Sequence, residues 1–233
     1  MTRSEHRYAG NCDAAALAHH QFARAFGLGF AIALTATALL LNLRPIAYGA
    51  TTAGDPAAIV KRTVGQVIEI LQDKRMSQDS RQHKVIEIVA GRFDFADMAR
   101  SSLGYNWKKL SPAQRQQFVP LFTAFMEDAY LNKIDSYSGQ QVQFVGQTPI
   151  ADNASEVKTV VQPAESSDPP IHINYLLKRN GSDWKVYDVA VDDISITANY
   201  RNQFNRMIEQ QGFDGLMSAM REKQQELRQS IGA

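Results

Sequence analysis

The spacing of apolar residues changes twice along this chain, and these changes set the order of its secondary structure. Before Gln140 and after Thr197, apolar residues recur every three or four positions, which is the period of an amphipathic helix. Between those positions the period is two, which predicts strands with one buried face. The alternating residues are Val142 and Phe144; Val157, Thr159 and Val161; and Ile171, Ile173, Tyr175 and Leu177. Helices, then strands, then helices predict an α+β domain.

The strands are expected to form one antiparallel meander. Asn180-Gly181 separates the third alternating run from a fourth at 184–191, and this dipeptide is a strong signal for a tight hairpin turn. The other connections are short apart from the one through 166–170. We therefore predict a four-stranded antiparallel sheet. The fourth strand is apolar on both faces, so its inward set stays open between the two parities.

Capping residues predict the helix boundaries. Asp55-Pro56 combines an N-cap with a proline at the first helical position. The run 111–114, Ser-Pro-Ala-Gln, is a capping box that starts a helix expected to reach about residue 136. Gly104 should end a helix over 93–103. Thr197 is the expected cap of the helices that follow the sheet, with a stop at Gly212.

The first fifty residues have the parts of a secretory signal. Arginines precede an apolar run from Ala25 to Leu43, and the small residues Ala47 and Gly49 follow it. We expect cleavage near 49–53, which leaves residues 51–233 as a single domain. The alternative is a retained anchor, because a bilayer span takes about 20 apolar residues. The one cysteine, Cys12, lies in the leader, and a cysteine-free remainder suits a periplasmic location.

Composition and motifs point away from several function classes. The net charge is +1 and no long basic run occurs, so nucleic acid is not an expected partner. No nucleophile elbow, zinc-protease helix or phosphate loop is present. Beyond the leader the histidines are His83 and His172, in different elements. We expect no catalytic residues, no metal site and no cofactor, hence no enzyme.

The residues that carry a resemblance are four motifs in a fixed order. They are F-D-F-x-x-M-A-R-x-x-L-G-x-x-W at 93–107, L-S-P-A-Q-R-Q-Q-F at 110–118, W-K-V-Y-D-V at 184–189 and I-S-I-T-A-N-Y-R-N-Q-F at 194–204. Together they resemble the MlaC family, the periplasmic lipid-binding proteins also called toluene-tolerance proteins. The resemblance extends over 55–227. Asp193 departs from the pattern, since it stands where the family usually has glycine.

The resemblance implies a periplasmic carrier that holds phospholipid acyl chains in an apolar cavity between sheet and helices. It would shuttle lipid between the outer and inner membranes and so maintain lipid asymmetry. The implied partners are an inner-membrane ABC transporter with an MCE-domain subunit and an outer-membrane lipoprotein complex. A hopanoid is an alternative cargo, and a membrane-tethered adaptor with a solid core is an alternative function. A lipid hydrolase ranks lower because no nucleophile arrangement is visible.

Apolar residues on the predicted inward faces are the candidate lipid contacts, although the same spacing fits an ordinary packed core. Arg100, Arg115 and Arg201 are expected in surface or structural ion pairs, with a headgroup contact as the alternative. The expected lining comprises Met98, Leu103, Trp107, Phe122, Phe125, Val142, Phe144, Ile173, Tyr175, Leu177, Tyr187, Val189, Tyr200 and Phe204.

Overall fold

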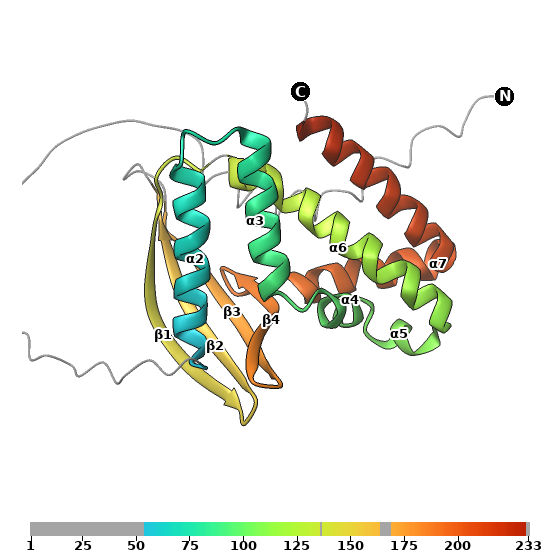
Figure 1. The fold of residues 1–233 in the computed structure, drawn as a ribbon. Coiled ribbons are helices and arrows are strands. Elements are labelled where there is room, and N and C mark those ends of the chain that lie inside the picture. Colours follow the sequence, from blue (N-terminus) through green and yellow to red (C-terminus); the bar gives the residue numbers. More distant parts are fainter. Residues whose placement is uncertain (1–53, 136, 164–168, 232–233) are drawn as a thin grey trace, which may run out of the picture.

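The computed structural model describes residues 54–135, 137–163 and 169–231, which form an α+β domain (Figure 1). The expected leader, residues 1–50, lies outside this part of the chain. The helices are α2 (Pro56–Gln72), α3 (Gln78–Arg92), α4 (Phe95–Leu103), α5 (Tyr105–Lys109), α6 (Pro112–Asp135) and α7 (Ile196–Ile231). The strands are β1 (Gln141–Ala151), β2 (Ala154–Gln162), β3 (Ile171–Asn180), β4 (Asp183–Val191) and β5 (Ile194–Ser195).

The sheet is an antiparallel meander in the order β1-β2-β3-β4-β5. The predicted meander is confirmed, with one strand more than the four expected. The extra strand, β5, has two residues and follows a turn in which Asp192 and Asp193 both have positive φ. A two-residue strand is too short to show a period of two, which is why the sequence pattern did not reveal it.

Side-chain caps start the helices at the predicted places, with one exception. Asp55 accepts a hydrogen bond from the backbone N–H of Ala58 and caps α2. Ser111 and Gln114 form the reciprocal capping box of α6, at 3.2 and 2.9 Å. At α7 the structure corrects the expected Thr197 cap.

The α7 cap is Ser195, whose Oγ accepts from the N–H of Ala198 at 3.0 Å. The N–H of Thr197 instead donates to the buried carboxylate of Asp188 at 3.1 Å. Further along, Gly212 has φ 73° and ψ 179°, so α7 consists of two helical segments as predicted. Pro120 lies inside α6 on an exposed position, and α6 runs through it unbroken.

The apolar side chains form two clusters. The helical cluster joins α4, α6 and α7 around Phe118 and Phe122, both fully buried. The sheet cluster joins the start of α2 to the inner faces of β2, β3 and β4. Phe93 and Ile196 are half-buried and pack against both clusters. The interior is therefore two packed regions that meet along a partly accessible seam.

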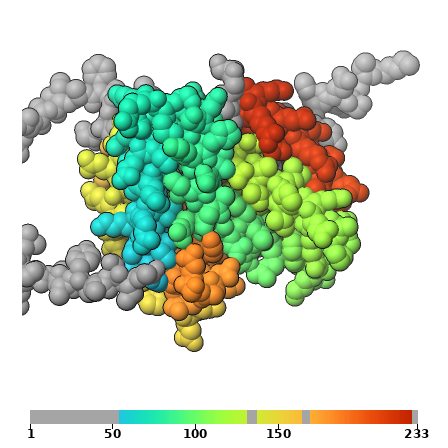
Figure 2. Space-filling model, viewed as in Figure 1, coloured from blue at the N-terminus to red at the C-terminus, as the bar shows by residue number. Residues whose placement is uncertain are grey.

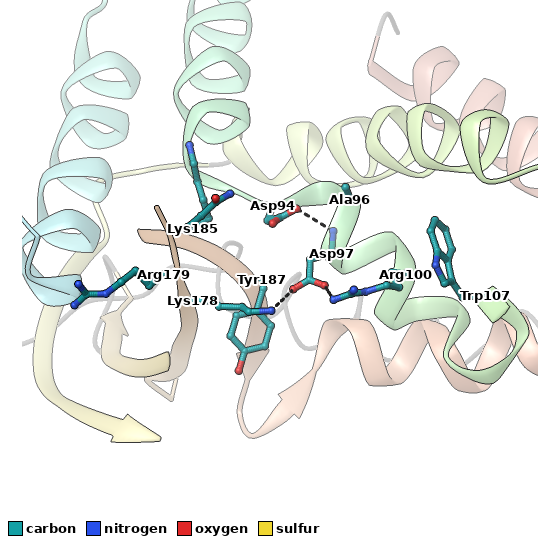
Figure 3. Close-up of a pocket in the computed structure, with 10 residues that line it drawn as sticks. Asp94, Ala96, Asp97, Arg100, Trp107, Lys178, Arg179, Lys185 and Tyr187 are labelled. Atoms are coloured by element: carbon teal, nitrogen blue, oxygen red, sulfur yellow. Dashed lines mark hydrogen bonds and ion pairs between the residues drawn. The ribbon is translucent and has the colours of Figure 1, made fainter. Parts of the chain in front are cut away.

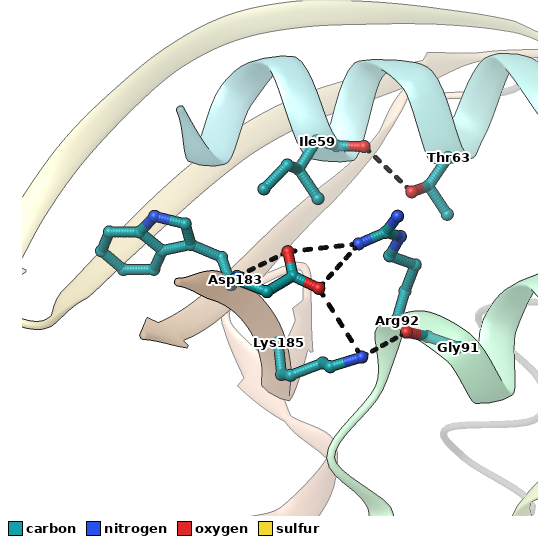
Figure 4. Close-up of polar contacts among 7 residues, drawn as sticks. Ile59, Thr63, Gly91, Arg92, Asp183 and Lys185 are labelled. Carbon is teal, nitrogen blue, oxygen red and sulfur yellow. Dashed lines mark hydrogen bonds and ion pairs between the residues drawn. The ribbon is translucent and has the colours of Figure 1, made fainter. Parts of the chain in front are cut away.

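Polar contacts fix the end of α3 to the start of β4 (Figure 4). Arg92 Nη1 lies 3.1 Å from the Asp183 carboxylate, and Lys185 Nζ donates to the Gly91 carbonyl at 2.5 Å. Next to this junction, the N–H of Asp94 donates to the carbonyl of Val186, which anchors the chain before α4. In the described ranges, none of the helices combines the length and hydropathy that a bilayer crossing needs.

Candidate functional site

Two groups of helices contact the sheet, one at each end of its strand order. Helix α2 packs over β1 and β2, while α3, α4 and α7 contact β4. Figures 1 and 2 show α2 and α3 side by side in front of the sheet. Strand β3 lies between the two groups of helices. Its inward residues Ile173 and Tyr175 are only half-buried, although β3 is the central strand of the sheet.

Tyr175 occupies an interior position yet keeps accessible surface. Burial raises the pKa of its phenol to about 12, opposed by a hydrogen bond with Thr159. Its cross-strand neighbours, Val157 on β2 and Val189 on β4, are buried. A side chain that is enclosed by the protein but still accessible faces space instead of packed atoms.

Tyr130 of α6 has a similar environment. Burial, together with the charges of Tyr200 and Asp188, raises its pKa, and its side chain is nevertheless only half-buried. It packs against the helical cluster, whereas Tyr175 packs against the sheet cluster. Accessible aromatic surface is thus present on both sides of the seam between the clusters.

The strand register shows which of the predicted lining residues lie on the same face of the sheet. Val142 pairs with Val161, Phe144 with Thr159, and Ile173 with both Thr159 and Val191. The inward set also includes Tyr175, Leu177 and Val189. The structure therefore brings these predicted residues together on one face. Phe144 lies at the open edge of that face and is 36% exposed.

Tyr187 departs from that face because β4 contains a bulge. Leu176 pairs with Asp188 and Leu177 with Val186, so Tyr187 has no partner on β3. The bulge reverses the alternation, and the inward residues of β4 are Trp184 and Val186 before it and Val189 and Val191 after it. This reversal explains why the fourth strand is apolar at both parities in the sequence.

Most of the predicted helical residues lie in the packed helical cluster. Met98, Leu103 and Phe122 have at most 1% of their surface accessible, so they contact no open space in this structure. Phe125, Tyr200 and Phe204 are buried with them, and their rings contact one another edge-on or tilted. Leu177 of β3 is also fully buried. These residues therefore belong to the packed core and do not line accessible space.

Trp107 and Tyr187 both line a polar pocket of about 490 Å³ between α4 and the β3–β4 hairpin (Figure 3). The other lining residues are Asp94, Ala96, Asp97, Arg100, Lys178, Arg179, Asn180 and Lys185. Asp97 pairs with Arg100 on its own helix and lies 3.8 Å from Lys178 Nζ of β3. One carboxylate therefore joins two walls of the pocket.

The three candidate arginines have different roles. Arg115 Nε donates to the Trp107 carbonyl at 3.2 Å, and its guanidinium lies 5.2 Å from the centre of that ring. Arg201 Nε donates to the Ser101 carbonyl at 2.7 Å. Both arginines therefore make structural contacts, with carbonyl groups and a ring instead of the expected ion pairs. Arg100 faces the polar pocket.

The residues that sequence reasoning missed lie on α2 and α3. Val67, Ile68 and Leu71 continue the apolar face of α2 but are only half-buried, as are Ile86 and Val89 of α3. The helical spacing of α2 was recognised, but spacing is the same for a packed face and for one that borders open space. Only the positions of the neighbouring elements distinguish the two.

A meander sheet whose central strand keeps accessible apolar surface under a cover of helices defines an α+β domain suited to hold an apolar ligand. Comparison with known proteins assigns this domain to a family. The profile described as MlaC protein matches residues 61–222. The chain belongs to the MlaC family.

One similar sequence and one similar structure agree with this family. It is 25% identical over 123 residues to the intermembrane phospholipid transport system binding protein MlaC of Haemophilus influenzae, an alignment of 52% of this chain and 57% of that protein. The chain therefore matches little more than half of that relative's length. A phospholipid-binding protein from Ralstonia solanacearum, solved in complex with a phospholipid, has the same fold. Its TM-score is 0.67 at 24% identity, covering 75% of this chain and 99% of that one.

Proposed function

We propose that this protein is a phospholipid carrier that takes acyl chains into the space over β3. The observation that carries the proposal is the accessible surface of Ile173 and Tyr175 at the centre of the sheet. The half-buried apolar residues of α2 and α3 supply the facing wall. The solved relative, which holds a phospholipid on the same fold, supports this assignment.

Acyl chains need such a space because they cannot cross water exposed. Each methylene removed from water contributes about 0.8 kcal/mol, so two long chains represent roughly 20 kcal/mol. A bilayer solvates them nearly as well, so exchange with a membrane is close to balanced. Such a carrier performs no covalent step, and the direction of transport comes from its partners.

We further propose a periplasmic location, with residues 1–50 as a cleaved signal and 51–233 as the carrier domain. The family resemblance supports an inner-membrane ABC transporter with an MCE-domain subunit and an outer-membrane lipoprotein complex as partners. The carrier would then shuttle lipid between the two membranes. A hopanoid would fill the same apolar space, and identification of the cargo separates it from phospholipid.

The test is a variant that fills the space without adding charge. Ile173→Trp adds volume over β3, and His172→Trp adds the same ring at the exposed neighbouring position. Mature protein of each kind is incubated with fluorescent phospholipid vesicles, separated from them and assayed for bound lipid. We expect Ile173→Trp to lose most of its lipid while keeping its unfolding temperature within a few degrees. Equal loading of the two variants would contradict the proposal.

A further inference from the structure

The short helix α5 presents an outward face that combines an aromatic ring with two lysines. Tyr105, Lys108 and Lys109 are exposed, and their spacing of three and four residues places them on the same side of the helix. Tyr105 is 71% exposed, more than any other large apolar side chain in the described residues. Lys109 Nζ lies 4.6 Å from the centre of the Tyr105 ring, so ring and charge are neighbours. We call these three residues the α5 face.

The opposite side of α5 is fixed to two other helices. Asn106 donates from its side-chain amide to the Asn205 side chain of α7 at 2.9 Å. Trp107 lies 5.2 Å from the Arg115 guanidinium of α6, and its carbonyl accepts from Arg115 Nε at 3.2 Å. Figure 1 shows α5 at the outer end of the helices, beside the start of α6 and away from α2. The α5 face is therefore a fixed part of the surface.

The positive charge of this face is not offset by a neighbouring carboxylate. Residues 98–126 contain no aspartate or glutamate. Within the described part of the chain, Lys108, Lys109 and Arg115 form no ion pair, and Glu209, one helical turn beyond the α7 contact, forms none with them. Arg115 donates to backbone carbonyls of α5, which leaves its charge in place. Such a local excess of cations attracts an anionic partner.

The side chains of the α5 face are of the types found at the headgroup level of a bilayer. A tyrosine ring lies there with its hydroxyl in water, and a lysine covers apolar surface with its methylenes while its ammonium stays at the surface. Protein interfaces are instead depleted in lysine, and a stable one buries about 800 Å² on each partner, more than one helical turn presents. The α5 face therefore fits an anionic lipid surface better than an acidic protein.

We propose that the α5 face docks the protein on an anionic membrane, with the Tyr105 ring at headgroup level and Lys108 and Lys109 on lipid phosphates. One ring and two lysines make a weak and reversible contact. The carrier function proposed above is not needed for it, because the contact uses none of the residues over β3. In a carrier, the same contact would hold the protein at a membrane while lipid is exchanged.

Vesicle flotation tests this surface. The mature protein is mixed with vesicles of phosphatidylcholine, or of phosphatidylcholine with phosphatidylglycerol, and the bound fraction is measured against lipid concentration. The test variants are the double substitution Lys108→Gln/Lys109→Gln and the single substitution Tyr105→Ala. The matched control is Lys61→Gln/Arg62→Gln, which removes two adjacent exposed cations of α2 that form no ion pair in the described ranges.

We expect wild type to bind the vesicles that contain phosphatidylglycerol and to bind phosphatidylcholine alone much less. A lysine near an anionic surface contributes about fivefold to partitioning, so the double lysine variant should bind about twenty-five-fold more weakly. Tyr105→Ala should weaken binding several-fold, and added salt should release the wild type. The Lys61/Arg62 control should bind as wild type does.

Two results would overturn the proposal. One is equal binding of the wild type and the double lysine variant to the anionic vesicles. The other is a wild type that does not prefer them, and its binding to poly-L-glutamate would then identify an acidic protein as the partner of this face. Ile173→Trp, which should lose lipid loading, should still float with the anionic vesicles, so failure of the carrier function and failure of this proposal are distinguishable.

Discussion

Gly104 is the position where one methyl group should cost the most. It ends α4 with φ 53° and ψ −122°, a combination that only glycine adopts without strain. A Cβ placed there would lie 2.9 Å from Cδ of Arg201, whose Nε donates to the Ser101 carbonyl at 2.7 Å. Gly104→Ala therefore strains the backbone and displaces the contact that joins α4 to α7.

Both effects are large enough to measure. Backbone strain at such a position is about 1–3 kcal/mol, and a hydrogen bond from a charged donor contributes about 1.5–3 kcal/mol. Because Arg201 is only half-buried, we take the lower part of the second range and expect a total of about 3–4 kcal/mol. In a domain of this size that lowers Tm by roughly 10 °C.

Urea unfolding followed by circular dichroism checks this value. The control is Gly65→Ala in the middle of α2, where a new Cβ has no atom within 4 Å. It should raise the free energy of unfolding by about 0.5–1 kcal/mol. A double-mutant cycle with Arg201→Ala separates the clash from the strain. A Gly104→Ala protein within 1 kcal/mol of wild type would refute the reasoning.

Three other changes have defined outcomes. Asp193→Gly should stabilise the protein by about 0.5–1 kcal/mol in urea unfolding, since Asp193 has φ 65°; Asp192→Gly should gain less, because it also loses the bond from the His172 N–H to the Asp192 carboxylate. Ser111→Ala should cost about 1 kcal/mol in the same assay by removing the α6 cap. Burial and the Asp128 charge, opposed by Arg228, raise the pKa of Glu127, so its ionised form destabilises the fold above that pKa. Glu127→Gln should therefore raise the midpoint of unfolding at pH 7, and a gain that persists below pH 4 would contradict this sign.

Local chemistry was the most predictable level of this structure. The caps at Asp55 and Ser111 depend on residues within three positions of each other, so the sequence contains all the information they need. The inward-facing residues of β3 were equally predictable, because apolar and polar residues alternate along this strand without a break. The resemblance predicted glycine at position 193, and this has a physical basis, since Asp193 lies in a left-handed turn that favours glycine.

Features that depend on non-local geometry were not predictable in the same way. The bulge at Tyr187 is visible only in the pairing of β3 with β4, so parity misplaced that residue. Phe122 is packed among residues of α4, α6 and α7, whereas Tyr175 keeps accessible surface on the central strand, and this difference depends on which elements pack against each residue. The polar pocket lies between α4 and a hairpin about eighty residues later in the chain, so no local sequence motif predicts it.

The most direct test of the carrier proposal is native mass spectrometry of the mature protein isolated from a bacterial periplasm, followed by solvent extraction and lipid identification. The proposal predicts a bound mass equal to that of a phospholipid, released on unfolding and reduced in Ile173→Trp. A protein that shows only its own polypeptide mass and takes up no lipid from vesicles would contradict it.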